Sequence, residues 1–196
     1  MAIDPVKGQG AQQNVHNRFD RYSFDSEDED VDLRKTNFTE VFPKTIVNQV
    51  KSPDLPMEYS LNPYQGCEHG CSYCFARPTH EYWGYSAGVD FERSIMFKRN
   101  APELLEKFFK KRGYQPKPIL VSGNTDCYQP VERKLEITRK ILQIFLDYRH
   151  PVNIITKNAL VLRDIDILKP LAEQNLVSVA LSIPTINEDL RRAMEP

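Results

Sequence analysis

From residue 57 onward, short apolar runs alternate with longer segments that have a helical period. The apolar runs are 58–64 (EYSLNPY), 118–124 (PILVSGN), 151–157 (PVNIITK) and 176–183 (LVSVALSI). The amphipathic segments between and after them are 101–113, 129–150 and 163–175. Apolar strands separated by helices indicate parallel pairing, with the helices covering the sheet.

Capping residues and prolines predict where the helices begin and end. Asn100, with Glu103 three residues later, predicts the start of the first helix, and Gly113 predicts its end. Pro130 opens the second helix, and Pro170 is expected to break or restart the third.

Four strand and helix units with right-handed crossovers are the beginning of a (β/α) barrel. A complete eight-unit barrel takes about 250 residues, whereas residues 58–196 contain only four units. The fourth strand would then be an open edge, which natural folds usually cover. The expected fold class is therefore α/β, a partial (β/α) barrel truncated after about four units. We expect the chain to be an N-terminal piece of a longer protein, with the barrel core at 58–196.

The region before residue 57 differs in character. Residues 1–36 are polar and include the acidic run from Asp25 to Asp30, so they are expected to form a disordered or loosely packed arm. Residues 37–57 read as a linker or N-terminal extension, in which 45–50 (TIVNQV) is compatible with an extended strand.

The amino-acid composition does not indicate a particular class of binding partner. The 196 residues are 40% hydrophobic and 27% charged with a net charge of −1, which is ordinary for a globular protein and gives no bulk attraction to nucleic acid or membrane. The start lacks the apolar core of a secretory signal, and no apolar stretch is long enough to span a bilayer. We therefore expect a cytoplasmic monomer without membrane contact.

Three of the four cysteines, Cys67, Cys71 and Cys74, lie within the nine residues GCEHGCSYC. In a reducing compartment such thiols indicate metal or redox chemistry rather than disulfides. Gly66 and Gly70 supply the backbone freedom that a tight curl of this loop needs. The residues leave three interpretations open, which are structural zinc with His69 or Cys127 as fourth ligand, an all-cysteine [4Fe–4S] carrier using Cys127, and a [4Fe–4S] cluster with one iron free of protein ligands.

The spacing C-x3-C-x2-C, with Tyr73 before the last cysteine and a barrel strand before the loop, resembles the radical S-adenosylmethionine (radical SAM) superfamily. The longer strings NPYQGCEHGCSYCFARPTHEYWG, TDCYQPVER, TKNALVLRDIDIL and MEP resemble a bacterial group related to its spore photoproduct lyase-like branch. The resemblance implies that the free iron binds SAM. It also implies that an electron from a donor such as flavodoxin or ferredoxin splits SAM into a 5′-deoxyadenosyl radical.

The resemblance also implies which residues contact SAM. Tyr73 matches the aromatic beside the adenine, Lys157 matches a lysine directed at the SAM carboxylate, and Ser182 matches a serine near SAM at the end of a strand. The loop after the second strand is expected to hold the SAM amino group through Ser122, Asn124, Thr125 and Asp126. This loop departs from the family's usual Gly-Gly-Glu, and ordinary turn chemistry also accounts for Asn124 and Asp126.

Other residues carry weaker expectations. Cys127 reads as a buried, inert thiol, and His69, His80 and Arg77 are candidates for contacts around the cluster or to substrate. No catalytic residue and no substrate is assigned; repair of a nucleic-acid lesion is one substrate hypothesis. The competing class is a non-catalytic zinc- or iron–sulfur-stabilised binding module or electron carrier.

Overall fold

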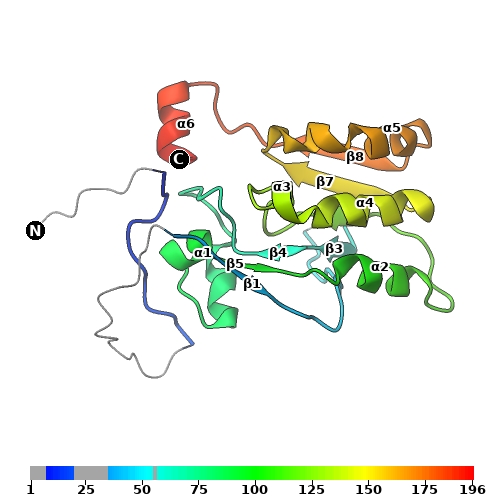
Figure 1. Ribbon diagram of the computed structural model, residues 1–196, viewed down its shortest axis with the longest axis horizontal. Helices are drawn as coiled ribbons and strands as arrows, with labels where there is room; N and C mark the ends of the chain where they lie inside the picture. The colour runs from blue at the N-terminus through cyan, green and yellow to red at the C-terminus, as the bar shows by residue number, and fades with distance from the viewer. Residues whose placement is uncertain (1–7, 20–34, 55–56) are drawn as a thin grey trace, which may run out of the picture. The chain divides into compact units, whose positions relative to one another are not determined.

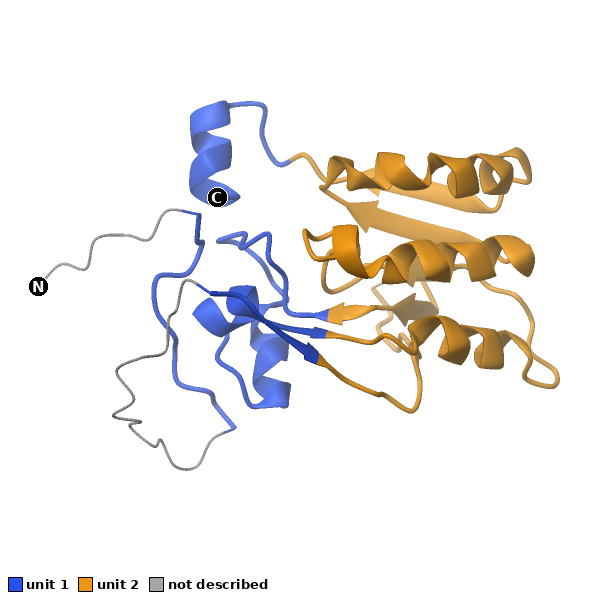
Figure 2. Ribbon diagram, in the orientation of Figure 1, with its two compact units in different colours: residues 1–39, 65–96, 184–196 blue, residues 40–64, 97–183 orange. Residues whose placement is uncertain are grey.

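The computed structural model describes residues 8–19, 35–54 and 57–196, and the chain divides into two compact units (Figure 2). Unit 1 consists of Met1–Thr39, Gln65–Met96 and Pro184–Pro196, and unit 2 consists of Glu40–Tyr64 and Phe97–Ile183. The three cysteines of the loop therefore belong to unit 1, and the three most apolar predicted strands belong to unit 2.

Unit 2 contains a five-stranded sheet with the order β2-β3-β6-β7-β8. Its strands are β2 (Val47–Gln49), β3 (Tyr59–Leu61), β6 (Ile119–Val121), β7 (Val152–Thr156) and β8 (Val177–Leu181). β2 pairs antiparallel with β3, and each later strand pairs in parallel with its neighbour. The register places Leu61 opposite Val121 and Val121 opposite Ile154. The predicted α/β fold with parallel strands is confirmed.

Three helices, α2 (Ala101–Phe109), α4 (Ile137–Asp147) and α5 (Ile165–Glu173), lie side by side along this sheet (Figure 1). The sequence of α4 explains its packing, because its apolar residues recur every three or four positions and fall on one face. That face buries Ile137, Ile141, Leu142 and Phe145 almost completely. Burial of each such side chain stabilises the fold by about 1.5–3 kcal/mol.

The single helix expected over 129–150 is two helices, α3 (Glu132–Leu135) and α4. Glu136 separates them with a left-handed backbone (φ 51°). The carboxylate of Glu132 accepts hydrogen bonds from the backbone N–H groups of Thr138 (3.0 Å) and Arg139 (3.3 Å). These groups lie in the first turn of α4, where no carbonyl of the helix can serve them. A buried carboxylate thus takes the place of helical bonds at the break.

Pro170 lies inside α5 and does not break it. Proline removes one N–H from a helix, and the carbonyl that loses its partner is four residues earlier. Here that residue is Asp166, which is exposed at the start of the helix. The missing bond therefore leaves no buried polar group, and the expected interruption is wrong.

Unit 1 is built around short elements. Most residues of a three-stranded sheet with the order β1-β5-β4 belong to it. Its elements are β1 (Asn37–Glu40), β4 (Tyr64–Gln65), the 3-10 helix η1 (Arg77–Trp83), α1 (Val89–Arg93), β5 (Ser94–Phe97) and α6 (Glu188–Met194). Phe91 packs with Cys67 and Ala76 in a small buried cluster.

The expected N-terminal arm is described only in part, and the acidic run from Asp25 to Asp30 lies outside the described residues. Residues 8–19 are described and make specific contacts within unit 1. The side-chain amide of Asn17, for example, donates to the carbonyls of Glu81 (3.0 Å) and Tyr85 (3.1 Å). These residues are held more firmly than their polar composition predicts.

Across the described ranges, no helix combines the length and the apolar character needed to cross a membrane.

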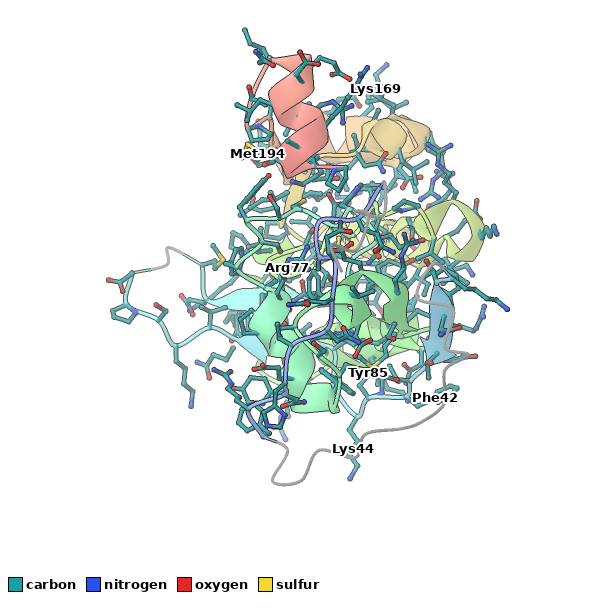
Figure 3. The ribbon with its side chains drawn as sticks, turned by 90° about the vertical axis from the view of Figure 1, so that its left-hand side faces the viewer. Phe42, Lys44, Arg77, Tyr85, Lys169 and Met194 are labelled. Atoms are coloured by element: carbon teal, nitrogen blue, oxygen red, sulfur yellow. The ribbon has the colours of Figure 1, made fainter. Side chains whose placement is uncertain are left out.

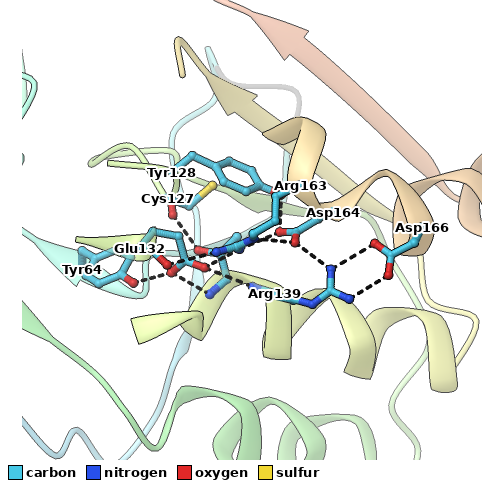
Figure 4. Close-up of polar contacts among 9 residues, drawn as sticks. Tyr64, Cys127, Tyr128, Glu132, Arg139, Arg163, Asp164 and Asp166 are labelled. Carbon is cyan, nitrogen blue, oxygen red and sulfur yellow. Dashed lines mark hydrogen bonds and ion pairs between the residues drawn. The ribbon is translucent and has the colours of Figure 1, made fainter. Parts of the chain in front are cut away.

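A buried network of charged groups ties unit 2 together (Figure 4). Its centre is Arg163, which follows β7 in the 3-10 helix η2 (Ala159–Asp164). Arg163 donates to the carboxylates of Glu132 (2.8 Å) and Asp164 (2.7 and 2.8 Å), both of which are fully buried. Tyr64 donates to Glu132, and Tyr128 donates to Asp164 (3.1 Å). Burial raises the pKa of both tyrosines, so they remain hydroxyl donors.

Replacing Arg163 with methionine should destabilise the protein strongly. Glu132 would lose its charged partner in a buried site, whereas Asp164 would keep its ion pair with Arg139 (2.9 Å). Breaking a buried ion pair from one side costs about 3–5 kcal/mol. The exposed pair of Arg191 with Glu188 (2.8 Å) provides the control, because solvent screens exposed ion pairs and Arg191→Met should therefore cost far less. Urea unfolding measures the free energy of unfolding of both variants. If the two variants lose the same free energy of unfolding, the buried network stabilises the protein no more than an exposed ion pair does.

Candidate functional site

The cysteine loop of unit 1 is curled by two glycines and by its own backbone hydrogen bonds. Gly66 and Gly70 both have positive φ (77° and 60°), a region that glycine adopts without steric cost. The N–H of Gly70 donates to the carbonyl of Cys67 (3.4 Å), and the N–H of Cys74 donates to that of Cys71 (3.3 Å). The tight curl expected from the glycine positions is therefore present.

The thiols of this loop suit a soft metal centre. All three cysteines are free, Cys67 and Cys71 are buried, and Cys74 is half-buried. Within the parts of the chain that the structure describes, no three His, Cys, Asp or Glu side chains could hold one metal ion. The cysteines of an iron–sulfur cluster bind different iron atoms, so they need not meet around a single ion.

Arg77 is hydrogen-bonded to the main chain of the cysteine loop. Its guanidinium donates to the carbonyls of Gly70 (3.0 Å) and Cys71 (3.1 and 2.9 Å), which lie between the first two cysteines and at the second. Its charge is paired with Glu92 (2.5 Å), whose side chain is only 2% exposed. Arg77 is one of the labelled side chains in Figure 3. Arg77, one of the weaker sequence candidates, therefore binds the main chain of the cysteine loop.

Tyr73 is about half exposed and donates a hydrogen bond from its hydroxyl to the carboxylate of Glu195. The same carboxylate lies 4.0 Å from the sulfur of Cys71. Next to it, the carbonyl of Met194 at the end of α6 accepts from the N–H of Ser72 (2.9 Å). The chain's last residues thus contact the cysteine loop within unit 1. The sequence contains MEP as a string, but nothing in its pattern indicates that contact.

His80 is fully buried, with its ring 5.0 Å from that of Tyr85 and 5.6 Å from that of Phe91. Burial lowers the pKa of His80 to about 4, so it is neutral at pH 7. His80 therefore packs as a neutral aromatic ring in unit 1 and carries no positive charge.

In unit 2, the loop after β6 is rigidly bonded. Ser122 has φ 75°, unusual for a residue with a side chain. Its hydroxyl donates to the carbonyl of Thr125 (2.7 Å) and accepts from the N–H of Cys127 (2.9 Å), which closes the turn. Asn124 donates its N–H to the side-chain oxygen of Asn62 (2.9 Å), and Thr125 donates its hydroxyl to the carbonyl of Tyr64 (2.9 Å).

Asp126 joins this loop to the end of β7. Its carboxylate accepts from the hydroxyl of Thr156 (2.7 Å), the N–H of Lys157 (2.9 Å) and the N–H of Tyr128 (2.8 Å). Ser182, just after β8, donates its N–H to the carbonyl of Thr156 (2.9 Å). The candidates after β6, β7 and β8 are therefore linked through Asp126 and Thr156 at one edge of the sheet. Tyr73, the remaining candidate for SAM contact, belongs to unit 1.

Cys127 is completely buried, and this burial raises the pKa of its thiol well above the ordinary value. Because the thiolate is the form that binds metals and attacks electrophiles, a thiol held protonated is inert. The geometry agrees with the interpretation of Cys127 as a packing residue.

Two residues at the same edge of unit 2 are absent from the sequence-based set. Asn62 directly follows β3, as the other candidates follow their strands, so its position at a strand end could have indicated it. Lys98 donates to the carbonyl of Asn62 (2.8 Å), and burial lowers its pKa to about 8. Lys98 lies in the loop before α2, and no sequence pattern connects it with Asn62.

Replacing Asp126 with asparagine should loosen this edge of the sheet. The amide group can accept at one atom only, so at least one of the three bonds is lost, at a cost of about 1–3 kcal/mol. Hydrogen exchange at the N–H of Lys157 should become faster. Asp147→Asn, in an exposed position at the end of α4, should change neither quantity. Unchanged exchange at Lys157 would show that Asp126 does not hold the loop.

Comparison with known proteins gives three kinds of similarity, to related sequences, to a solved structure and to a family model. An uncharacterized protein of Mycobacterium tuberculosis is 35% identical over 159 residues, which cover 81% of this chain and 47% of that protein. An uncharacterized protein of Methanocaldococcus jannaschii is 31% identical over 163 residues, covering 83% and 57%. The chain spans about half the length of these curated relatives.

The second similarity is to a solved structure, spore photoproduct lyase complexed with a dinucleoside spore photoproduct. The TM-score is 0.50 at 12% identity, over 80% of this chain and 54% of that one, which is a likeness of fold. The family model described as the radical SAM superfamily matches residues 61–196, a range that includes the cysteine loop and every candidate residue. With well over half of its residues in that match, the chain belongs to the radical SAM superfamily.

Proposed function

We propose that this chain binds a [4Fe–4S] cluster through Cys67, Cys71 and Cys74 and takes part in the reductive cleavage of SAM. One observation carries the proposal. The three cysteines occupy a loop curled at Gly66 and Gly70 in a chain of the radical SAM superfamily. When bound, the cluster would supply the electron that splits SAM into methionine and a 5′-deoxyadenosyl radical. The protein's own part is to hold cluster and SAM and to keep water and other quenchers away.

The residues proposed to hold SAM fall into two groups. In unit 1, Tyr73 would lie beside the adenine. In unit 2, the turn formed by Ser122, Asn124 and Thr125 would offer backbone and side-chain oxygens to the amino group. Lys157 would pair with the carboxylate, and Ser182 would stand beside it. The three bonds that Asp126 already accepts support a role in positioning Lys157 and this turn.

The arrangement of strands in unit 2 supports a partial (β/α) barrel as the scaffold. Its four parallel strands follow one another in chain order, and helical segments connect them. In such barrels the functional groups gather at the carboxyl ends of the strands. The polar groups after β3, β6, β7 and β8 have this placement.

The reaction would need a reducing partner such as flavodoxin or ferredoxin. We propose a nucleic-acid lesion as the substrate class to test first, because the structure of similar fold is that of a lyase bound to a dinucleoside photoproduct. This is an analogy of fold, and the net charge of −1 adds no bulk attraction to nucleic acid. The competing function is a binding module or electron carrier stabilised by zinc or iron–sulfur.

Cluster binding should depend on each of the three loop cysteines and not on Cys127. After anaerobic reconstitution, the single variants Cys67→Ala, Cys71→Ala and Cys74→Ala should lose nearly all cluster-bound iron and sulfide, because each removes one of three ligands. Cys127→Ala should keep both. Iron and sulfide analysis with the visible spectrum measures the outcome. Bound zinc in place of iron, or loss of iron on Cys127→Ala, would favour the competing functions.

SAM binding should depend on the charge of Lys157. Loss of a charge-assisted hydrogen bond weakens binding by about 1.5–3 kcal/mol, or roughly ten- to a hundredfold. Lys157→Ala should therefore weaken SAM binding to the reconstituted protein by that factor and slow 5′-deoxyadenosine formation under reduction, with iron content unchanged. Lys169→Ala, at an exposed position of α5 in the same unit, is the matched control. Equal SAM affinity in both variants would remove Lys157 from the site.

A further inference from the structure

Residues 9–17 run along unit 1 and are attached to it by paired hydrogen bonds. Val15 exchanges two bonds with the hydroxyl of Ser86, both 2.7 Å long. The side chain of Asn14 donates to the carboxylate of Asp90 (2.8 Å) and accepts from its N–H (2.9 Å). Together with the bonds of Asn17 described above, these contacts join two parts of the chain that are more than sixty residues apart. We call residues 9–17 the strap.

The N-terminal end of the strap is hydrogen-bonded to Glu92, the ion-pair partner of Arg77. The N–H groups of Gly10 (3.2 Å) and Ala11 (2.8 Å) donate to the two carboxylate oxygens of Glu92. The same carboxylate is bonded to Arg77, which donates to the carbonyls of Gly70 and Cys71. Charge-assisted hydrogen bonds therefore run without interruption from the strap to the cysteine loop.

The strap also passes so close to the loop that a side chain would not fit between them. A Cβ atom built on Gly10 would lie 1.7 Å from the carbonyl oxygen of Gly70. Further along, a Cβ on Gly88 would lie 2.2 Å from the carbonyl oxygen of Gln13. Contacts this close require glycine at both positions, because real Cβ atoms do not approach backbone that closely. Gly10 in the strap and Gly88 opposite it therefore both allow the strap to pack closely against the rest of unit 1.

We propose that the strap is part of the cluster-binding machinery, as a positioning element that holds the cysteine loop through Glu92 and Arg77. The inference rests on the proposed cluster at Cys67, Cys71 and Cys74. Groups that orient metal ligands without touching the metal commonly change metal affinity by about ten- to a hundredfold when they are removed. Without the strap, Glu92 would lose two donors, Arg77 would be less firmly held, and the carbonyls of Gly70 and Cys71 would be freer to move.

The test displaces the strap without touching a cysteine. Gly10→Ala introduces the clash with Gly70, and Asn14→Ala removes two bonds without any clash, which keeps the test valid if the glycine variant does not fold. His16→Ala is the control, because His16 is an exposed residue of the same strap. The first measurement is amide hydrogen exchange of residues 70–77 in protein prepared without iron. The second is the rate at which reconstituted protein releases iron to a chelator.

Gly10→Ala and Asn14→Ala should each speed exchange in residues 70–77 and release iron at least tenfold faster than wild type, with His16→Ala unchanged. If both variants match wild type in exchange and iron release, the strap has no role in holding the loop. If wild type takes up no iron at all, the proposed cluster fails, while the exchange experiment still decides whether the strap holds the loop.

Discussion

The ion pair between Arg77 and Glu92 is the interaction on which the candidate centre depends. Three thiols can surround one cluster only if the loop that carries them keeps its curl, and the main-chain carbonyls of that loop are bound by the guanidinium of Arg77. An arginine in that position needs a partner charge, because an unpaired buried charge is costly. Glu92, almost fully buried, is that partner. The strap, the loop and α1 are therefore three parts of one electrostatic arrangement.

In unit 2, as in unit 1, buried carboxylates accept hydrogen bonds from backbone N–H groups. Asp126 accepts a hydroxyl and a backbone donor from the end of β7 and a backbone donor from the loop after β6, and Glu132 accepts backbone donors from the first turn of α4. In each case a carboxylate collects N–H groups that the regular elements leave unpaired. Such carboxylates lock the polar edge of the sheet into one arrangement, which is what a site that positions a cofactor requires. Each of the two units thus has its own rigid support for the residues proposed to act.

The regular part of the fold could be predicted from the sequence because its signals are local. Apolar runs gave β6, β7 and β8, and the three- and four-residue spacing gave α4. The cysteine loop was predicted because ligand type, spacing and glycine positions all lie within nine residues. The features that escaped prediction depend on specific side-chain contacts, some local and some long-range, that produce no periodic pattern. Glu136 adopts a left-handed backbone without being glycine, because Glu132 satisfies the helix that follows.

The strap escaped prediction for the same reason. Its polar residues resemble a disordered arm, and their partners lie 64 to 82 residues further along the chain. The contact of Glu195 with Tyr73 spans 122 residues and likewise leaves no periodic pattern. Among the strand-end candidates, the sequence indicated Asp126 as a cofactor contact, whereas the structure places three protein donors on its carboxylate. The roles of these candidates toward SAM stay predictions.

The central claim, a cluster held by three cysteines with one iron left for SAM, is tested most directly by Mössbauer spectroscopy of protein reconstituted with isotopically labelled iron. The spectrum is recorded before and after addition of SAM. The account predicts the signature of a [4Fe–4S] cluster in which a single iron site changes when SAM is added. A spectrum without such a cluster, or a cluster whose iron sites are all indifferent to SAM, would contradict it.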